Sequence, residues 1–202
     1  GLVASILYAE NKVFGKKDNS SKVIITDNLR TYLKDQPGEN LGYFVSTLKP
    51  DLEYNEEKTF WENAQIFNKK IKRLLEKDIL KNQVVDLFSP KLLDMVMLNL
   101  FGKREDKLAQ KIIKKAGMYK NYATFTIANL GLIKPEDNSG KFKLKELFGP
   151  FAVSEAMEKY VSVLTINNQL HFSISFNEKD MSKELILKII KLIPQIFNDR
   201  PR

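Results

Sequence analysis

The sequence predicts an α/β fold in which a mixed β-sheet is covered by helices. Short β-branched runs recur along the chain between longer segments whose apolar residues are spaced by three and four, as in amphipathic helices. Two alternating runs also flank Asn167 and Asn168, which is typical of a β-hairpin. The 202 residues can bury a sizeable core and show no internal repeat or linker, so we expect residues 1–202 to form a single domain.

The first third of the chain predicts a helix, two strands and a second helix. Residues 1–10 are apolar and typical of a core helix entered partway, so the chain is expected to be a fragment; the polar residues up to Ser21 predict a loop. Residues 23–26 and 41–48 are rich in β-branched and aromatic side chains, which favours strands. Residues 56–80 carry one apolar stripe and predict a helix opened by two glutamates, whose charge complements the helix dipole.

The middle of the chain predicts two more helices and a strand. Pro90 suits the first turn of an apolar helix that Gly102 stops, and residues 104–116 predict the next helix. Residues 122–131 then return to strand composition. We expect this strand to form an edge of the sheet.

The hairpin is the clearest local signal. Asparagine tolerates the positive φ that a two-residue hairpin turn requires, so Asn167 and Asn168 predict the turn itself. This turn pairs Ile166 with Gln169. Side chains alternate along a strand, so the pairing places four apolar residues on one face of the sheet: Val161, Val163, Phe172 and Ile174.

The last element predicted is a C-terminal helix. Ser182 is a suitable N-cap, because its side chain can accept a hydrogen bond from a free backbone N–H of the first turn. Pro194 is expected to kink or end the helix. The residues expected to face the core are Leu185, Ile186, Ile189, Ile190 and Ile193.

The net charge of +8 invites a nucleic-acid function, but the position of the lysines argues against it. They interleave with apolar residues, as in residues 69–75 and 111–115, so each group predicts the solvated face of an amphipathic helix. We therefore expect no nucleic-acid partner. An RNA-binding alternative rests on charge alone, and the same charge could attract an anionic cofactor such as coenzyme A.

The sequence lacks cysteine and long apolar runs, and both features bear on the cellular location that we expect. The chain has no cysteine, which is compatible with a reducing compartment, so we expect a cytoplasmic protein. No apolar run approaches the roughly 20 residues of a membrane span, so we expect none.

Few residues suggest chemistry. The only histidine, His171, lies in a predicted strand and is interpreted as a hydrogen-bonded or half-exposed side chain in preference to a catalyst. Trp61 is interpreted as a core or rim aromatic in preference to a platform for bases. No phosphate-binding loop, zinc-protease motif or serine-hydrolase motif is present, so we predict no catalytic residue and no metal site in this chain.

Three stretches, taken in order, resemble the C-terminal lobe of the chloramphenicol-acetyltransferase-like superfamily, which includes condensation domains and fungal alcohol acetyltransferases. In the first, a strand ends in Asp27-Asn28-Leu29-Arg30, similar to the family's Asp-x-Arg segment. Residues 39–46, with Gly42 and Ser46, then resemble its Gly-Asn-x-Val loop, and Phe60-Trp61 fits the aromatic-Trp helix that follows.

The second stretch, Ala128-Asn129-Leu130-Gly131, resembles the family's Ser-Asn-x-Gly strand at the tunnel between the two lobes. Here Ala128 replaces the serine and removes its hydroxyl. Thr126 could supply one from the same face of the strand, because strand side chains repeat every second residue.

The third stretch is the hairpin and the terminal helix, residues 160–197. In the family's catalytic lobe this strand-to-helix step carries His-His-x-x-x-Asp, whereas residues 176–181 here contain no histidine. The chain therefore resembles the non-catalytic lobe. It also lacks the Asp-Phe-Gly-Trp-Gly motif of the plant branch, so the fungal alcohol acetyltransferase type is the closer match.

The resemblance implies one lobe of a two-lobe acyl-CoA-dependent acyltransferase. Its partner would be an N-terminal catalytic lobe, in the same or a separate chain, whose histidine acts as general base on a small-molecule alcohol or amine. No cofactor would be bound; acetyl-CoA or another acyl-CoA would be the co-substrate. The edge strand around residues 122–131 would close a cleft against that lobe, and the implied substrate- or cofactor-binding residues are Thr126, Asn129, Gly131 and Ser46.

Two alternatives stay open. Asn129 and Thr126 could equally be strand residues with satisfied amide and hydroxyl groups. The missing histidine and the Ala128 departure also permit a non-catalytic binding or scaffold module that keeps the same fold.

Overall fold

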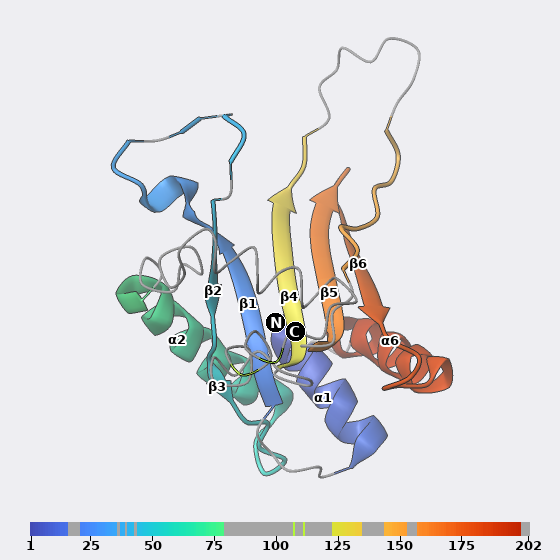
Figure 1. Ribbon diagram of the computed structural model, residues 1–202. Coiled ribbons are helices and arrows are strands. Elements are labelled where there is room, and N and C mark those ends of the chain that lie inside the picture. Colours follow the sequence, from blue (N-terminus) through green and yellow to red (C-terminus); the bar gives the residue numbers. More distant parts are fainter. Residues whose placement is uncertain are drawn as a thin grey trace.

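The computed structural model describes residues 1–15, 21–35, 37–38, 40–42, 44–78, 107, 111, 123–134, 144–152 and 157–198. Within them the main sheet has the strand order β2-β1-β4-β5-β6, and β3 pairs with the start of β1 (Figure 1). The strands are β1 (Ser21–Asn28), β2 (Val45–Leu48), β3 (Asp51–Leu52), β4 (Ala123–Leu132), β5 (Met157–Ile166) and β6 (Gln169–Phe176).

The sheet is mixed, as the sequence predicts. Strands β1, β4 and β5 are mutually parallel, whereas β2 and β6 pair antiparallel at the two sides. Parallel strands need long crossover connections, and β1 and β4 are accordingly about a hundred residues apart in sequence. The α/β prediction is confirmed.

One face of the sheet packs against three helices: α1 (Leu2–Phe14), α2 (Phe60–Asp78) and α6 (Lys183–Asn198). Alternation along the strands sends apolar side chains from β1, β4 and β5 to this face. The buried core that results includes residues from every layer: Ile6, Val23, Phe67, Phe125, Val161 and Ile189. We call this face the helix face of the sheet.

Strand β4 lies in the middle of the sheet, so the prediction of an edge strand at residues 122–131 is wrong. It pairs with β1 on one side and β5 on the other, and residues 123–128 are almost entirely buried. Parallel sheets are buried on both faces, which explains why side chains on both faces of this segment are buried. Only its carboxyl end, from Asn129 onward, emerges from the core.

Two element boundaries also differ from the sequence prediction. Helix α1 continues to Phe14, where Gly15 ends it with a positive φ, because Val13 and Phe14 still pack against the core. Strand β2 covers only residues 45–48 of the expected 41–48, and Leu41 is fully exposed. Aromatic composition alone therefore predicts a longer strand than the one that forms.

Helix α2 begins at Phe60, later than the glutamates that were expected to open it. Thr59 and Glu62 form a capping box: the Thr59 N–H donates to Glu62 Oε2 at 2.8 Å, and the Glu62 N–H donates to Thr59 Oγ1 at 3.3 Å. These hydrogen bonds, the backbone one foremost, hold the pKa of Glu62 below its usual value. The local cap therefore decides the start of the helix more strongly than the nearby negative charge.

The C-terminal hairpin and helix follow the sequence prediction closely. Asn167 and Asn168 have φ values of 50° and 60°, and Ile166 pairs with Gln169. In α6, the Leu185 N–H donates to Ser182 Oγ at 3.4 Å, so the predicted N-cap is confirmed. The helix does not end at Pro194 but continues to Asn198. The helices expected from Pro90 to residue 116 lie outside the described residues, apart from Lys107 and Lys111.

A buried ion pair joins the first helix to the sheet. Lys159 Nζ on β5 lies 2.8 Å from Glu10 Oε1 on α1, and the two side chains are 1% and 8% exposed. Glu158 Oε2 also lies 3.3 Å from the same ammonium group. Lys159 occupies a position on the helix face between Phe125 and Phe176, where an unpaired charge would be strongly unfavourable.

We expect Lys159→Met to destabilise the protein by about 3–5 kcal/mol, because it removes the buried cation that lies 2.8 Å from the Glu10 carboxylate. The double variant Glu10→Leu/Lys159→Met should recover most of that loss, since it removes both charges. Chemical denaturation of the wild type, Lys159→Met, Glu10→Leu and the double variant measures the coupling. A single variant as stable as the wild type would contradict this account of the pair.

We expect Thr59→Ala to lower the free energy of unfolding by about 1 kcal/mol at neutral pH, whereas Thr59→Ser keeps the cap. The contribution of Glu62 is present above the ordinary glutamate pKa and is lost as pH falls through its lowered folded-state value. Denaturation at neutral and at acid pH should therefore show a smaller difference between Thr59→Ala and the wild type in acid. An unchanged difference would show that Glu62 takes no part in the cap.

Candidate functional site

The carboxyl end of β4 is the most irregular part of the sheet. The register with β5 shifts between Asn129 and Leu132, and Gly131 has a φ of +72°, where glycine is favoured over L side chains. The Gly131 N–H donates to Asn129 Oδ1 at 2.9 Å, so the asparagine stabilises the bulge in which it lies. Open α/β sheets commonly bind ligands at the carboxyl ends of their strands, so the bulge is a candidate binding site.

An apolar hollow of about 280 Å³ opens beside Asn129 on the helix face. Its walls come from the start of α1, the middle of α2, the three parallel strands and the first residues of β6. The lining side chains are Leu2, Val3, Ala4, Ile25, Ala64, Phe67, Asn68, Ile71, Ile127, Asn129, Val163 and Leu170. Two carboxamides, Asn68 and Asn129, are the polar side chains in this set, and both are exposed. We call this space the acyl hollow, after the ligand that we propose for it below.

Thr126 does not line the acyl hollow. Residues 126 and 128 point to the face opposite the helix face, because β4 is regular over residues 123–129. Thr126 is 4% exposed, and its Oγ1 has no hydrogen-bond partner among the residues that the structure describes. The structure therefore separates Thr126 from Asn129 by the thickness of the sheet.

Ser46 and Gly131 also take different positions. Ser46 is buried on β2 opposite Asp27, one strand further from the hollow than β1, so β1 lies between it and β4. Gly131 shares the bulge with Asn129. Of the four predicted binding residues, the structure brings together only Asn129 and Gly131, and the binding role of all four stays a prediction.

The loop after β1 lies at the same end of the sheet as the bulge, because β1 and β4 are parallel (Figure 1). Arg30 organises this loop: its Nη1 donates to Gly38 O at 2.7 Å and its Nη2 to Asn40 O at 2.9 Å. Its guanidinium also lies 4.2 Å from the ring centroid of Phe44, a cation–π contact. A Cβ on Gly42 would come within 2.6 Å of that ring, which gives this glycine a steric role.

Tyr32 adds a polar group to this loop. Its hydroxyl donates to Asp27 Oδ2 at 3.3 Å, and partial burial, the charge of Asp27 and this hydrogen bond all raise the pKa of the phenol. The tyrosine therefore stays protonated well beyond neutral pH, as a donor and not as a base.

His171 lies on the face opposite the helix face, paired with Leu164. Its imidazole is half-buried and meets the Phe148 ring edge-on, with centroids 5.9 Å apart. Its Nε2 is buried with no hydrogen-bond partner within the described ranges. The half-exposed side chain that the sequence predicts is therefore confirmed.

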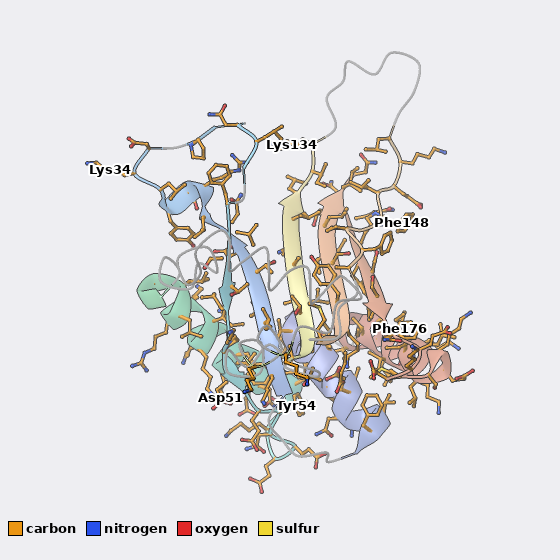
Figure 2. All side chains as sticks on the ribbon, in the orientation of Figure 1. Lys34, Asp51, Tyr54, Lys134, Phe148 and Phe176 are labelled. Carbon is orange, nitrogen blue, oxygen red and sulfur yellow. The ribbon has the colours of Figure 1, made fainter. Side chains whose placement is uncertain are left out.

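Exposed apolar side chains gather at the carboxyl ends of β4 and β5. Leu130 and Leu132 are 50% and 59% exposed, and Leu170 at the start of β6 is similarly open. Residues 144–152 run along the same region, held by Asn167 Nδ2, which donates to Leu144 O and Lys145 O at 2.9 Å. Phe148 is labelled beside β5 and β6 in Figure 2. This concentration of open apolar surface is typical of an interface.

Two further properties concern the part of the chain that the structure describes. No group of three or more acidic or histidine side chains is arranged there to hold a metal ion. None of its helices combines the length and apolar character needed to cross a membrane.

Comparison with solved structures shows the class of fold. Over 96% of this chain, the epimerization domain from the third module of tyrocidine synthetase B aligns with a TM-score of 0.59 and 14% identity. A structure of the enacyloxin polyketide synthase, concerned with condensation domain-mediated chain release, aligns over 98% with a TM-score of 0.56 and 12% identity. The first condensation domain of the CDA synthetase gives values of 95%, 0.52 and 10%.

The chain therefore has the fold of one lobe of the condensation-domain, or chloramphenicol-acetyltransferase-like, class. It spans only 39%, 34% and 38% of the three chains, so it corresponds to part of each of them. No family model matches the sequence, and no curated protein matches it either. The predicted resemblance is thus confirmed at the level of the fold.

We expect Gly131→Ala to destabilise the protein by about 1 kcal/mol through backbone strain alone, because its φ is positive and no atom lies within 4 Å of the added Cβ. Gly131→Asn should cost less, since asparagine tolerates this conformation. Thermal denaturation of the two variants separates strain from steric clash. Equal losses for both would mean that the bulge relaxes away from the positive φ.

Proposed function

We propose that this chain is the C-terminal lobe of an acyl-CoA-dependent acyltransferase of the alcohol O-acetyltransferase type, and that it forms one wall of the tunnel for the acyl donor. The observation that carries the proposal is the acyl hollow beside Asn129, in a lobe with the condensation-domain fold. The absence of cysteine continues to support a cytoplasmic location.

The composition of the hollow suits an acyl chain. Its lining is predominantly aliphatic, so burying methylene groups there would be favourable by about 0.8 kcal/mol each. Asn129 and Asn68 are placed where a carboxamide could donate to a polar head or to the developing oxyanion. Asn129 already uses its Oδ1 for the bulge, which leaves its Nδ2 as the donating atom and fixes its orientation.

The chemistry would be completed by the missing lobe. Its histidine would remove the proton from an alcohol or amine acceptor, which then attacks the thioester carbonyl. Collapse of the tetrahedral intermediate transfers the acyl group to the acceptor and releases the coenzyme A thiolate, which regains a proton. The exposed residues Leu130 and Leu132 are the proposed contacts to that lobe.

The second candidate is a non-catalytic binding or scaffold module with the same fold, favoured by the lack of His-His-x-x-x-Asp in this chain. The Ala128 departure supports it less than the sequence suggested. Ala128 is buried on the face opposite the acyl hollow, so a serine hydroxyl there would not reach the hollow. An upstream lobe without the histidine motif would favour this candidate.

The test uses the two-lobe protein and follows thiol release from acetyl-CoA and longer acyl-CoA donors, with medium-chain alcohols and amines as acceptors. Asn129→Ala should lower kcat by about tenfold or more if its Nδ2 contacts the reacting carbonyl. Leu170→Trp should raise KM for long acyl donors about tenfold and affect acetyl-CoA less.

The matched control is Leu187→Trp, which adds the same ring to an exposed position on α6 and should leave both parameters unchanged. Absence of turnover with every acceptor would reject the acyltransferase. Binding of acyl-CoA without turnover would support the scaffold module instead.

A further inference from the structure

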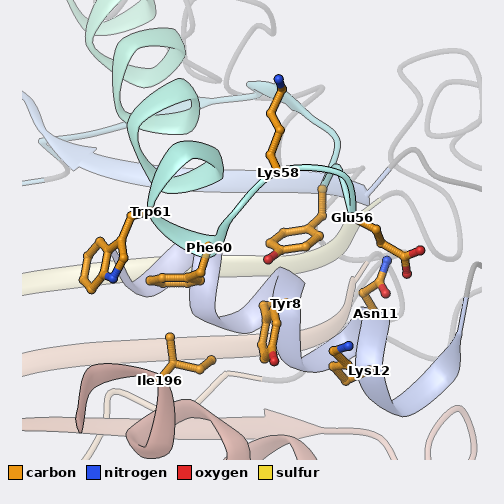
Figure 3. A pocket seen from close by; sticks show the side chains of 9 residues that line it. Tyr8, Asn11, Lys12, Glu56, Lys58, Phe60, Trp61 and Ile196 are labelled. Atoms are coloured by element: carbon orange, nitrogen blue, oxygen red, sulfur yellow. The ribbon is translucent and has the colours of Figure 1, made fainter. Parts of the chain in front are cut away.

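A second hollow, of about 480 Å³, lies at the opposite end of the helix layer from the acyl hollow. Asp51 and Tyr54 mark this end in Figure 2, far from Lys34 and Lys134 at the other. Its walls come from the second half of α1, the segment before α2, the start of α2 and the end of α6. The lining residues are Tyr8, Asn11, Lys12, Tyr54, Glu56, Lys58, Phe60, Trp61 and Ile196 (Figure 3). We call it the aromatic hollow.

Four aromatic rings shape the aromatic hollow. Tyr8 is central, with its ring edge-on to Tyr54 at 5.7 Å between centroids and to Phe60 at 6.2 Å. Phe60 in turn meets Trp61 edge-on at 4.9 Å. All four side chains are half-buried, so part of each ring remains open to solvent. Such a concentration of accessible aromatic surface around one concavity is the pattern of a small-molecule site.

The segment that carries Tyr54 and Lys58 is held rigidly. Asn63, which is 1% exposed on α2, donates from Nδ2 to Asn55 O at 2.8 Å and to Thr59 O at 3.0 Å. The Asn55 N–H donates back to Asn63 Oδ1 at 3.0 Å. Partial burial also raises the pKa of Tyr54, so its ring remains neutral at physiological pH. A preformed wall lowers the entropic cost of binding.

The charges around the aromatic hollow select the sign of a ligand. Lys12 Nζ lies 5.7 Å from the centre of the Tyr8 ring and already occupies the position that a ligand cation would prefer. Lys58 is exposed and extends from the rim (Figure 3), and Glu56 is the one acidic residue in the lining. The lining is therefore net positive in a chain of net charge +8, which disfavours a cation and favours an anion.

We propose that the aromatic hollow binds a planar aromatic ligand that carries a negative charge, with its ring among Tyr8, Phe60 and Trp61 and its anionic group at Lys12. A nucleoside monophosphate and an aromatic carboxylate share this chemistry. The site is separate from the acyl hollow, with which it has no lining residue in common, and it does not depend on the acyltransferase proposal.

The chain reports on this site directly, because Trp61 is its only tryptophan. Tryptophan emission and, in parallel, calorimetry follow titration with AMP and with phenylacetate. Adenosine and phenylacetamide are the neutral counterparts, and tetramethylammonium is the cationic probe. We expect AMP, phenylacetate or both to change the emission and release or absorb heat, with neutral counterparts binding about tenfold more weakly.

Two variants locate the contacts. Lys12→Gln should weaken binding of the anion about tenfold and leave its neutral counterpart unchanged, whereas the control Lys188→Gln, on an exposed position of α6, should change neither. Tyr8→Leu should weaken the charged and the neutral ligand alike. Lys12 is exposed, so its variant is expected to fold even if Tyr8→Leu does not.

A response to AMP alone or to phenylacetate alone supports the site. It also shows whether the ligand is a nucleoside monophosphate or an aromatic carboxylate. The proposal is overturned if neither tryptophan emission nor calorimetry responds to AMP or phenylacetate at millimolar ligand concentration. It is equally overturned if tetramethylammonium binds in preference to the anions, or if Lys12→Gln leaves anion binding intact.

Discussion

The three parallel strands β1, β4 and β5 impose the constraint on which the rest of the structure depends. Parallel strands lie in sheets that are covered on both faces, and the central strand β4 is buried from residue 123 to residue 128. Helices α1, α2 and α6 cover one of these faces, and their apolar stripes meet the alternating side chains of the strands there. The Lys159–Glu10 pair lies within this layer and ties α1 to β5.

The same constraint determines where the molecule can be open. Strand β4 loses its register with β5 at Asn129, where its side chains become exposed. The acyl hollow forms at that end, and the aromatic hollow forms at the other, where three helices and the segment before α2 meet. Both hollows have walls held by local hydrogen bonds: the Asn129–Gly131 contact at one and the Asn63 contacts at the other. Hollows at the two ends and a closely packed core between them are features of the same helix layer.

The elements that the sequence predicted well are those whose signals are local. The Asn167-Asn168 turn sets the hairpin register, and Ser182 with the spacing of the following isoleucines sets α6. The start of α2 differs from the prediction because Thr59 and Glu62 form a capping box, whose hydrogen bonds outweigh the charge of the glutamates at 56 and 57. The short β2 was overestimated because aromatic residues such as Phe44 serve in a loop here, under the Arg30 guanidinium. The aromatic hollow is not predicted from Phe60 and Trp61 alone, since its other walls come from α1, α6 and the segment before α2.

By itself the sequence determined the fold class, the hairpin, the terminal helix and the resemblance to an acyltransferase lobe. Each of these depends on residues close together along the chain, or on the order of short motifs. The tertiary structure alone decided that β4 is central, that Thr126 and Asn129 lie on opposite faces, and that two hollows exist. The physical reason is that strand neighbours and cavity walls come from segments far apart in sequence, as with β1 and β4, and their pairing is settled by burying the most apolar surface in a single core.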